Sequence, residues 1–274
     1  MSNDLVSIIM LSRNKGRYVA ESVRSVIAQT YQNWELIFMD DSSKDDTISQ
    51  MMDLMDEAKV KEPSTISTGS AAVTGSMSRI RVSQNVGAKG SALAMNSALR
   101  DAKGRWIAFL NVGDLWEPTK LERQIAFMEE NGYACSYTFY GVMDAASNDR
   151  RVVVSGKARV NHQDMLKCCW PAYLTVMYDA EKVGRMSVRT RQHNDYALWL
   201  NISDKHDFYL LPERLASLRT NWNLLGRLLL TNNTKWRYDA YHIDENLGKL
   251  KSFLYTFRNG WFGLVKWFKY VNRT

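Results

Sequence analysis

Cysteine and proline are scarce in this chain of 274 residues, which has three cysteines and four prolines. The cysteines are Cys135, Cys168 and Cys169; their number is odd, two are adjacent, and no C-x-x-C spacing occurs. Adjacent cysteines rarely bridge each other, so we predict buried or idle thiols in a reducing cytosol rather than disulfides or a zinc site. With 45% hydrophobic residues and so few prolines, the chain is not globally disordered.

Long apolar runs are absent as well. The first residues, MSNDLVSIIM, lack the basic region followed by a long apolar stretch that defines a signal peptide, and no run of about 18 apolar residues occurs. We therefore expect a cytoplasmic location, with peripheral binding to the inner face of the cytoplasmic membrane as the other possibility. The net charge of +7 favours an anionic partner, and charge alone leaves nucleic acid, anionic lipid and a nucleotide open.

Apolar strands alternate with amphipathic helices along the first half of the chain. Runs rich in β-branched or aromatic residues predict strands at 6–11, 34–39, 79–83 and from 106 onward, and 3.6-residue spacing predicts helices at 18–30, 47–58, 91–102 and from Pro118 to about 131. We expect Asp46 or Thr47 near the second helix's cap and Pro118 in the fourth helix's first turn. This alternation predicts an α/β fold with a parallel, doubly wound sheet.

The stretch at 62–78, EPSTISTGSAAVTGSMS, shows neither the helical nor the strand spacing of apolar residues. Its small and polar residues are typical of a flexible surface insertion. We expect it to interrupt the alternation without contributing to the core.

Polar clusters follow the predicted strands: SRN after the first, DDSS after the second, QNVG after the third and NVGD after the fourth. Ligands of doubly wound sheets bind at the carboxyl ends of the strands. Four polar strand ends in succession therefore predict a binding site at that edge.

Two of these clusters carry acidic residues. Asp40 and Asp41 can accept hydrogen bonds from a base N–H or from ribose hydroxyls, and a solvated turn that caps the next helix is an equally good explanation. Asn111, Gly113 and Asp114 could hold a divalent cation through oxygen atoms, although one carboxylate is few for a metal site, and a plain turn is the alternative.

Asp195 precedes a predicted amphipathic helix in which Ala197, Leu198 and Leu200 turn inward. An aspartate at a helix start is usually an N-cap, and it can act as a general base where it faces the site. The nearby His193 is weak evidence for any function.

Five segments in order resemble the family 2 glycosyltransferases: VSIIM…N (6–14), ESVRSVIAQTYQNWELIFMDDSSKDDT (21–47), NVGAKGSALAMNSAL (85–99), GRWIAFLNVGDLW (104–116) and NDYALWL (194–200). The resemblance covers roughly residues 5–220. It implies the GT-A fold, a Rossmann-like, mostly parallel sheet, over 1–220, with 221–274 as a helical C-terminal extension. It also implies inverting transfer of a sugar from a nucleoside diphosphate sugar, most often a UDP-sugar, to an acceptor hydroxyl.

The resemblance assigns roles to individual residues. Ser12 and Asn14 match the first strand end that contacts the nucleotide, Asp40 and Asp41 match the pair that reads base and ribose, and Asp195 matches the catalytic base. The loop over the nucleotide corresponds to Asn85, Gly87 and Lys89, with spacing slightly longer than usual.

The family's D-x-D-D motif corresponds to 111–114, so Asn111 and Gly113 replace both aspartates of the D-x-D. If a divalent cation such as Mg²⁺ or Mn²⁺ is used, Asp114 is its only acidic ligand here. Otherwise Lys89 and Arg191 are the candidates for neutralising the leaving diphosphate. The altered motif also admits an alternative function, a non-catalytic subunit that binds nucleotide sugars or serves as a scaffold.

Residues 246–274 contain six basic residues, eight aromatics and no acid. Large apolar residues recur at helical spacing, namely Leu250, Leu254, Phe257, Trp261, Leu264 and Phe268. This composition is typical of a helix on an anionic membrane, and a helix whose stripe packs on the catalytic domain explains it equally well. Similar tails occur in enzymes of capsule, O-antigen and teichuronic acid assembly, whose acceptors are lipid-linked saccharides. Nucleic acid is the poorest partner, because no recognition motif accompanies the charge.

Overall fold

The computed structural model describes residues 3–59, 73–76, 79–85, 90–189, 195–220 and 232–273. Its first half forms four parallel strands: β1 (Val6–Ser12), β2 (Trp34–Asp40), β4 (Ile80–Gln84) and β5 (Trp106–Asn111). They lie in the order β4-β2-β1-β5 and are connected through α1 (Gly16–Ile27), α2 (Thr47–Lys59) and α3 (Ser91–Asp101). The predicted parallel, doubly wound arrangement is confirmed.

The second half adds antiparallel strands. After the short β6 (Leu115–Trp116) and α4 (Lys120–Asn131), β10 (Met177–Asp179) lies antiparallel between β5 and β7 (Cys135–Met143). The sheet continues through β8 (Asp149–Val154) to β12 (Val271–Arg273), which brings the end of the chain into the sheet. The long β11 (Phe208–Arg219) is the exception, because it pairs parallel with β7, while its pairings with β6 and with β9 (Arg159–Val160) are antiparallel. The edge strand β3 (Val73–Ser76) pairs with β4.

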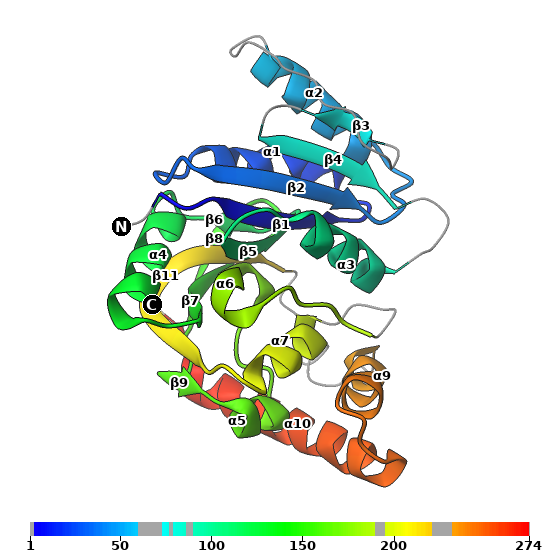
Figure 1. Ribbon diagram of the computed structural model, residues 1–274, viewed down its shortest axis with the longest axis vertical. Helices are drawn as coiled ribbons and strands as arrows, with labels where there is room; N and C mark the ends of the chain where they lie inside the picture. Colours follow the sequence, from blue (N-terminus) through cyan, green and yellow to red (C-terminus); the bar gives the residue numbers. More distant parts are fainter. Residues whose placement is uncertain are drawn as a thin grey trace.

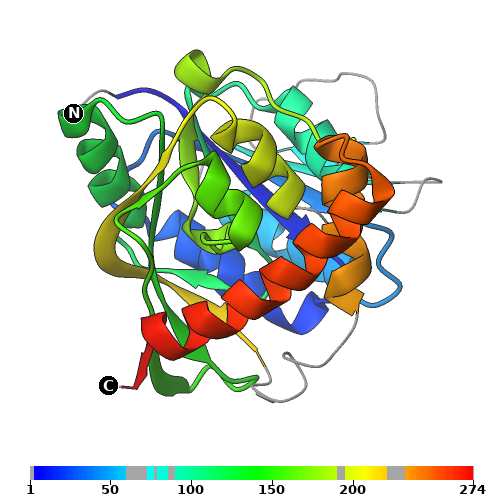
Figure 2. The same cartoon turned by 90° about the horizontal axis from the view of Figure 1, so that it is seen from below.

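Side chains on alternate faces of the strands build two apolar cores, as the period of two in a strand requires. Val6, Ile8 and Met10 pack with α1, α2 and α4, whereas Ile9 and Leu11 pack with α3 and the later helices. Those later helices are α5 (His162–Lys167), α6 (Ala180–Val183), α7 (Asp195–Ser203), α9 (Asn232–Asp239) and α10 (Lys249–Tyr270), with a 3₁₀ turn at Tyr173–Thr175 and a π turn at Ala240–Asp244. Figure 1 shows α7 and α10 on the same side of the sheet, and Figure 2 shows α10 crossing the outside of α5 and α7.

Several local predictions need correction. Pro118 precedes α4 instead of lying in its first turn, while Gly132 ends that helix at φ 68° as predicted. The predicted cap of α2 is confirmed, because the helix begins at Thr47 and Gln50 N donates to Asp46 O at 2.8 Å, while the side chain that accepts from Thr47 N is Asp45, at 3.1 Å. Within the predicted insertion, Val73–Ser76 forms strand β3, and the rest of 62–78 lies outside the described residues.

Two helices differ in how their apolar residues are placed. Helix α7 was predicted to be amphipathic, yet it is buried on nearly all sides, because α10 and the π turn cover the face that a surface helix would expose. In α10 the predicted stripe points outward: Phe257 and Phe268 are each 77% exposed and Trp261 is 62% exposed. Among the residues that the structure describes, most of the stripe is thus left uncovered, and only Leu264 of the six is partly buried.

The three cysteines form no disulfide, as predicted. Burial raises the pKa of each thiol, which makes them poor nucleophiles.

Candidate functional site

The carboxyl ends of the four parallel strands meet in register. Asp40 lies opposite Ser12 on one side and Gln84 on the other, and Asn111 lies opposite Leu11. The predicted clustering of polar strand ends is therefore present at one edge of the sheet.

Asp40 shapes the loop after β2. It is fully buried, and its carboxylate accepts hydrogen bonds from Ser43 N at 2.8 Å, from Gln84 Nε2 at 3.2 Å and from the Ser43 hydroxyl. Its oxygens are thus committed to neighbouring residues. The structure gives Asp40 a role in holding the loop that presents Asp41.

Asp41 lines the cavity at this edge. Its carboxylate accepts from Gly90 N at 3.1 Å and from Asn85 Nδ2 at 3.4 Å, and Arg13 Nη1 lies 3.4 Å from its other oxygen. These contacts tie β2, β4 and the start of α3 around one carboxylate. Asp41 is therefore the member of the acidic pair that a ligand in the cavity can reach.

Asn14 joins the loops after β1 and β2. Its backbone is left-handed, at φ 51°, its side-chain oxygen accepts from Lys44 N at 2.8 Å, and its own N–H donates to Ser43 Oγ at 2.8 Å. An asparagine tolerates this conformation better than most residues. The side chain positions the loops around the cavity.

The cavity has a volume of about 210 Å³. It is lined by Leu11, Ser12, Arg13, Lys15, Asp41, Ser91, Ala94, Asn111 and Val112. Ser12 and Ser91 are 5% and 6% exposed, and neither hydroxyl oxygen has a hydrogen-bond partner among the residues that the structure describes. Buried hydroxyls are normally satisfied, so two such groups in one cavity indicate a ligand that bonds to them.

Three lining residues were missed by the sequence prediction: Arg13, Lys15 and Ser91. The signal for the first two was present, because both directly follow the first strand end in the run SRNK. Cations in a loop are usually solvated, and only the fold shows that these two border a cavity.

A second cavity of similar volume lies near the other end of β5, lined among others by Lys103, Arg105 and Glu181. Its polar groups are already engaged: Arg105 pairs with Asp179 at 3.0 Å and with Asp4 at 2.6 Å. This cavity lies at the amino end of a parallel strand, where ligands of such sheets do not bind. We therefore place the functional site at the opposite edge.

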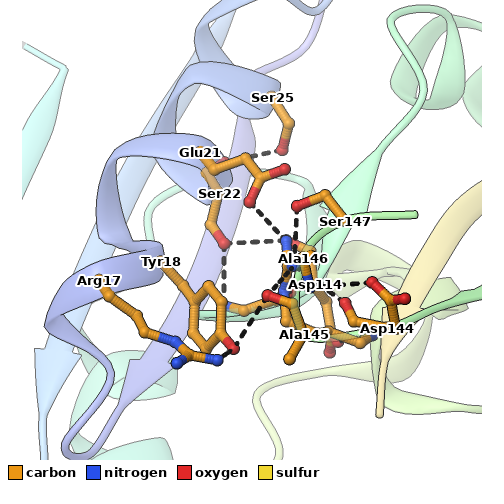
Figure 3. Close-up of polar contacts among 12 residues, drawn as sticks. Arg17, Tyr18, Glu21, Ser22, Ser25, Asp114, Asp144, Ala145, Ala146 and Ser147 are labelled. Carbon is orange, nitrogen blue, oxygen red and sulfur yellow. Dashed lines mark hydrogen bonds and ion pairs between the residues drawn. The ribbon is translucent and has the colours of Figure 1, made fainter. Parts of the chain in front are cut away.

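Asp114 is not among the residues that line the first cavity. Its carboxylate accepts from the backbone N–H of Arg219 on β11 at 2.9 Å, and its carbonyl accepts from Ser22 Oγ at 2.9 Å. The Arg219 guanidinium donates to Gly113 O at 2.6 Å and pairs with Glu21. Figure 3 shows Asp114 within this group of polar contacts, with Ser22 and Glu21 of α1 on one side and Asp144 on the other.

The residues at the end of β5 do not fit a metal held by carboxylates. Asn111 supplies only an amide, Gly113 supplies no side chain, and the Asp114 carboxylate is bonded to β11. Within the described ranges, no group of three or more His, Cys, Asp or Glu side chains is placed to hold an ion. A divalent cation would have to take nearly all its ligands from the donor and from water.

Asp195 begins α7 and is not among the residues that line the cavity. Its carboxylate accepts from Tyr196 N at 2.9 Å, and its charge contributes, after burial, to the raised pKa values of Cys169 and Tyr173. The Tyr173 hydroxyl is buried and has no hydrogen-bond partner among the described residues. Gly87, Lys89, Arg191 and His193 lie outside the described residues.

Helix α7 is fixed by the inward face of α10. Asn259 Nδ2 lies 3.0 Å from the hydroxyls of both Tyr196 and Tyr241, which are 2.6 Å from each other. Asn259 is 1% exposed, so this polar group is buried between the two helices. These hydrogen bonds join the inward face of α10 to α7, and Tyr255 and Phe262 of the same helix pack against the core.

Comparison with known proteins identifies the class. Residues 7–168 match the model of glycosyl transferase family 2, so the chain belongs to this family. It is a glycosyltransferase with the GT-A fold, as the sequence motifs indicated.

Two relatives carry more specific names. The chain is 36% identical over 243 residues to WfgD of Escherichia coli, named as a UDP-Glc:α-D-GlcNAc-diphosphoundecaprenol β-1,3-glucosyltransferase, with 82% of this chain and 87% of that protein covered. It is 33% identical over 252 residues to TuaG of Bacillus subtilis (strain 168), provisionally named for teichuronic acid biosynthesis, with coverage of 90% and 89%. Among solved structures, TarS 1–349 of S. aureus in complex with UDP-GlcNAc superposes with a TM-score of 0.61 at 14% identity, covering 91% of this chain and 71% of that one.

Proposed function

We propose that the protein transfers a sugar, with inversion, from a UDP-sugar to a hydroxyl of a lipid-linked saccharide during the synthesis of a cell-surface polysaccharide. The observation that carries this proposal is the cavity at the carboxyl ends of β1, β2 and β5 in a chain of family 2. Asp41 lines this cavity together with the Ser12 and Ser91 hydroxyls, which have no hydrogen-bond partner among the described residues. The names of WfgD and TuaG support the donor and the pathway class.

The side chains of the cavity suit a nucleotide. An ionised Asp41 accepts hydrogen bonds only, which matches a base N–H or ribose hydroxyls. Asn111 can donate to or accept from the ribose, and the Ser12 hydroxyl can bond to the neighbouring part of the nucleotide. Asn14 and Asp40 hold the surrounding loops, and Asn85 adds its contact to Asp41.

Asp195 is proposed as the base. Its carboxylate takes the proton of the acceptor hydroxyl as the hydroxyl oxygen attacks the anomeric carbon. The bond between that carbon and the diphosphate oxygen breaks, and UDP leaves with the bonding electrons. Attack from the face opposite the leaving group inverts the configuration.

The lipid-linked acceptor places the enzyme at the inner face of the cytoplasmic membrane, and α10 supplies a surface for binding there. None of the described helices combines the length and hydrophobicity needed to cross a bilayer. Seven large apolar side chains of α10 are exposed nonetheless, namely Leu250, Phe253, Leu254, Phe257, Trp261, Val265 and Phe268. Exposed lysines such as Lys251 and Lys269 lie among them, and residues 246–274 contain no acid. A helix of this kind lies in the interface of an anionic membrane.

The experiment for the proposed function combines binding with transfer. Calorimetry with UDP, GDP, ADP and CDP should show preferential binding of UDP. Incubation with a panel of UDP-sugars and a lipid-diphosphate-linked saccharide should then yield an extended saccharide detectable by mass spectrometry. Binding of UDP without transfer from any donor would instead support the scaffold alternative, and absence of UDP binding would refute both.

A further inference from the structure

Two cations border the candidate donor cavity at the place where a family 2 enzyme has its metal. Arg13 and Lys15 follow β1 directly and line the cavity together with Asn111. Asp41 is the only acidic residue in the same lining. The side chain of Arg13 is 53% exposed and lies 3.4 Å from Asp41, a distance at which it can still turn toward a stronger anion.

The start of α3 contributes further hydrogen-bond donors. This helix has 11 residues and begins at Ser91, and the Asp41 carboxylate accepts from the N–H of the preceding Gly90 at 3.1 Å. The N-terminus of a helix carries a partial positive charge and unpaired N–H groups, which together favour phosphate. The buried, unsatisfied hydroxyls of Ser12 and Ser91 line the same cavity and provide the independent sign of a ligand.

We propose that Arg13 and Lys15, with the start of α3 and the hydroxyls of Ser12 and Ser91, bind the donor's diphosphate in place of a metal held by carboxylates. This inference rests on the proposed function and deepens it. As the anomeric carbon–oxygen bond breaks, the diphosphate gains one negative charge. The ammonium of Lys15 and the guanidinium of Arg13 stabilise that charge by charge-assisted hydrogen bonds, so the loss of Asp at positions 111 and 113 is compensated.

The test measures how much the diphosphate adds to nucleotide affinity when no metal is present. Calorimetry in excess EDTA compares UDP with uridine for the wild type, for Lys15→Met, for Arg13→Met and for the control Lys205→Met, whose exposed lysine lies in the turn after α7. Wild type and control should bind UDP at least ten-fold more tightly than uridine. Lys15→Met should lose roughly ten-fold of that preference, the usual effect of one charged hydrogen bond, while its uridine affinity stays unchanged. Ser91→Ala should lose a smaller part, and thermal melts verify that each variant is folded.

A preference for UDP over uridine that requires Mg²⁺ or Mn²⁺ in the wild type would overturn the inference while leaving the proposed function intact. Equal preference in Lys15→Met, Arg13→Met and the control would overturn it too. No binding of UDP or uridine under any condition would refute the proposed function itself. If Mg²⁺ or Mn²⁺ increases UDP binding by Gly113→Asp more than it increases binding by the wild type, the inference is supported. That result would show that the wild type binds no metal because it lacks this carboxylate.

Discussion

The first residue of α7 carries the chemistry of the proposed reaction. Asp195→Asn keeps the shape and can still accept from Tyr196 N, but an amide cannot take the acceptor proton. Loss of a positioned base costs about 10²–10⁴-fold in rate, so kcat should fall by that factor while UDP affinity stays within about two-fold. Steady-state kinetics with calorimetry on the same sample checks this. Unchanged turnover with weaker UDP binding would show that Asp195 is structural.

Lys120 is a second single residue with a measurable signature. It is fully buried at the start of α4, where its Nζ donates to Gln124 Oε1 at 2.8 Å and lies 4.2 Å from the ring centroid of Trp116. Burial lowers the pKa of this lysine from 10.5 to about 7. Between pH 7 and 10.5 the unfolded chain therefore binds more protons at this lysine than the folded chain does. The free energy of unfolding contributed by Lys120 must then rise with pH across that window.

The prediction for Lys120 compares variants across pH. Lys120→Met should be more stable than the wild type at pH 6, where the buried ammonium is charged, and this advantage should shrink by pH 9. Urea unfolding at pH 6, 7, 8 and 9 measures it, with the exposed Lys205→Met as control. A difference between wild type and Lys120→Met that is constant with pH would mean that the ammonium stays charged in the fold.

At the scale of elements, the proposed membrane binding depends on the exposed face of α10. The variant Phe257→Ser/Trp261→Ser/Phe268→Ser removes three rings that are mostly exposed, so the melting temperature should change little. Wild type should sediment with vesicles that contain anionic lipid, less so in high salt, whereas the triple variant should stay in the supernatant. Ile27→Ser, which removes a 44% exposed side chain of α1, is the matched control and should sediment like the wild type.

A triple variant that still sediments would contradict the proposed surface. Loss of a cooperative melt in that variant would do so as well, because it would show that the stripe belongs to the core.

The elements also show what periodicity can and cannot predict. Four strands and four helices of the first half were predicted with small errors at their ends, because the buried strands are short apolar runs and the helices show a 3.6-residue apolar spacing. The burial of α7 and the outward stripe of α10 could not be predicted, since the same spacing of apolar residues fits either orientation. Contacts with distant residues show which face turns inward, among them those of Asn259 with Tyr196 and Tyr241.

For the whole molecule, the site at the edge of the parallel sheet was predictable because a polar cluster follows each of its four strands. Ser12, Asp41 and Asn111 from these clusters line one cavity. The motif comparison identified which aspartates were missing, but not that Asp114 bonds to β11, because Arg219 is about a hundred residues away in the chain. The roles of Asp114 and Asp195 stay predictions. Contacts between distant segments are the part of a site that local sequence does not encode.

The most direct test of the account is the anomeric configuration of the transferred sugar. The protein is incubated with UDP-sugars of α configuration and a lipid-diphosphate-linked saccharide in anionic vesicles, and the product linkage is assigned by proton NMR. The proposed single displacement by a hydroxyl activated by Asp195 predicts a β-linked product. An α-linked product, formed with retention, would contradict it.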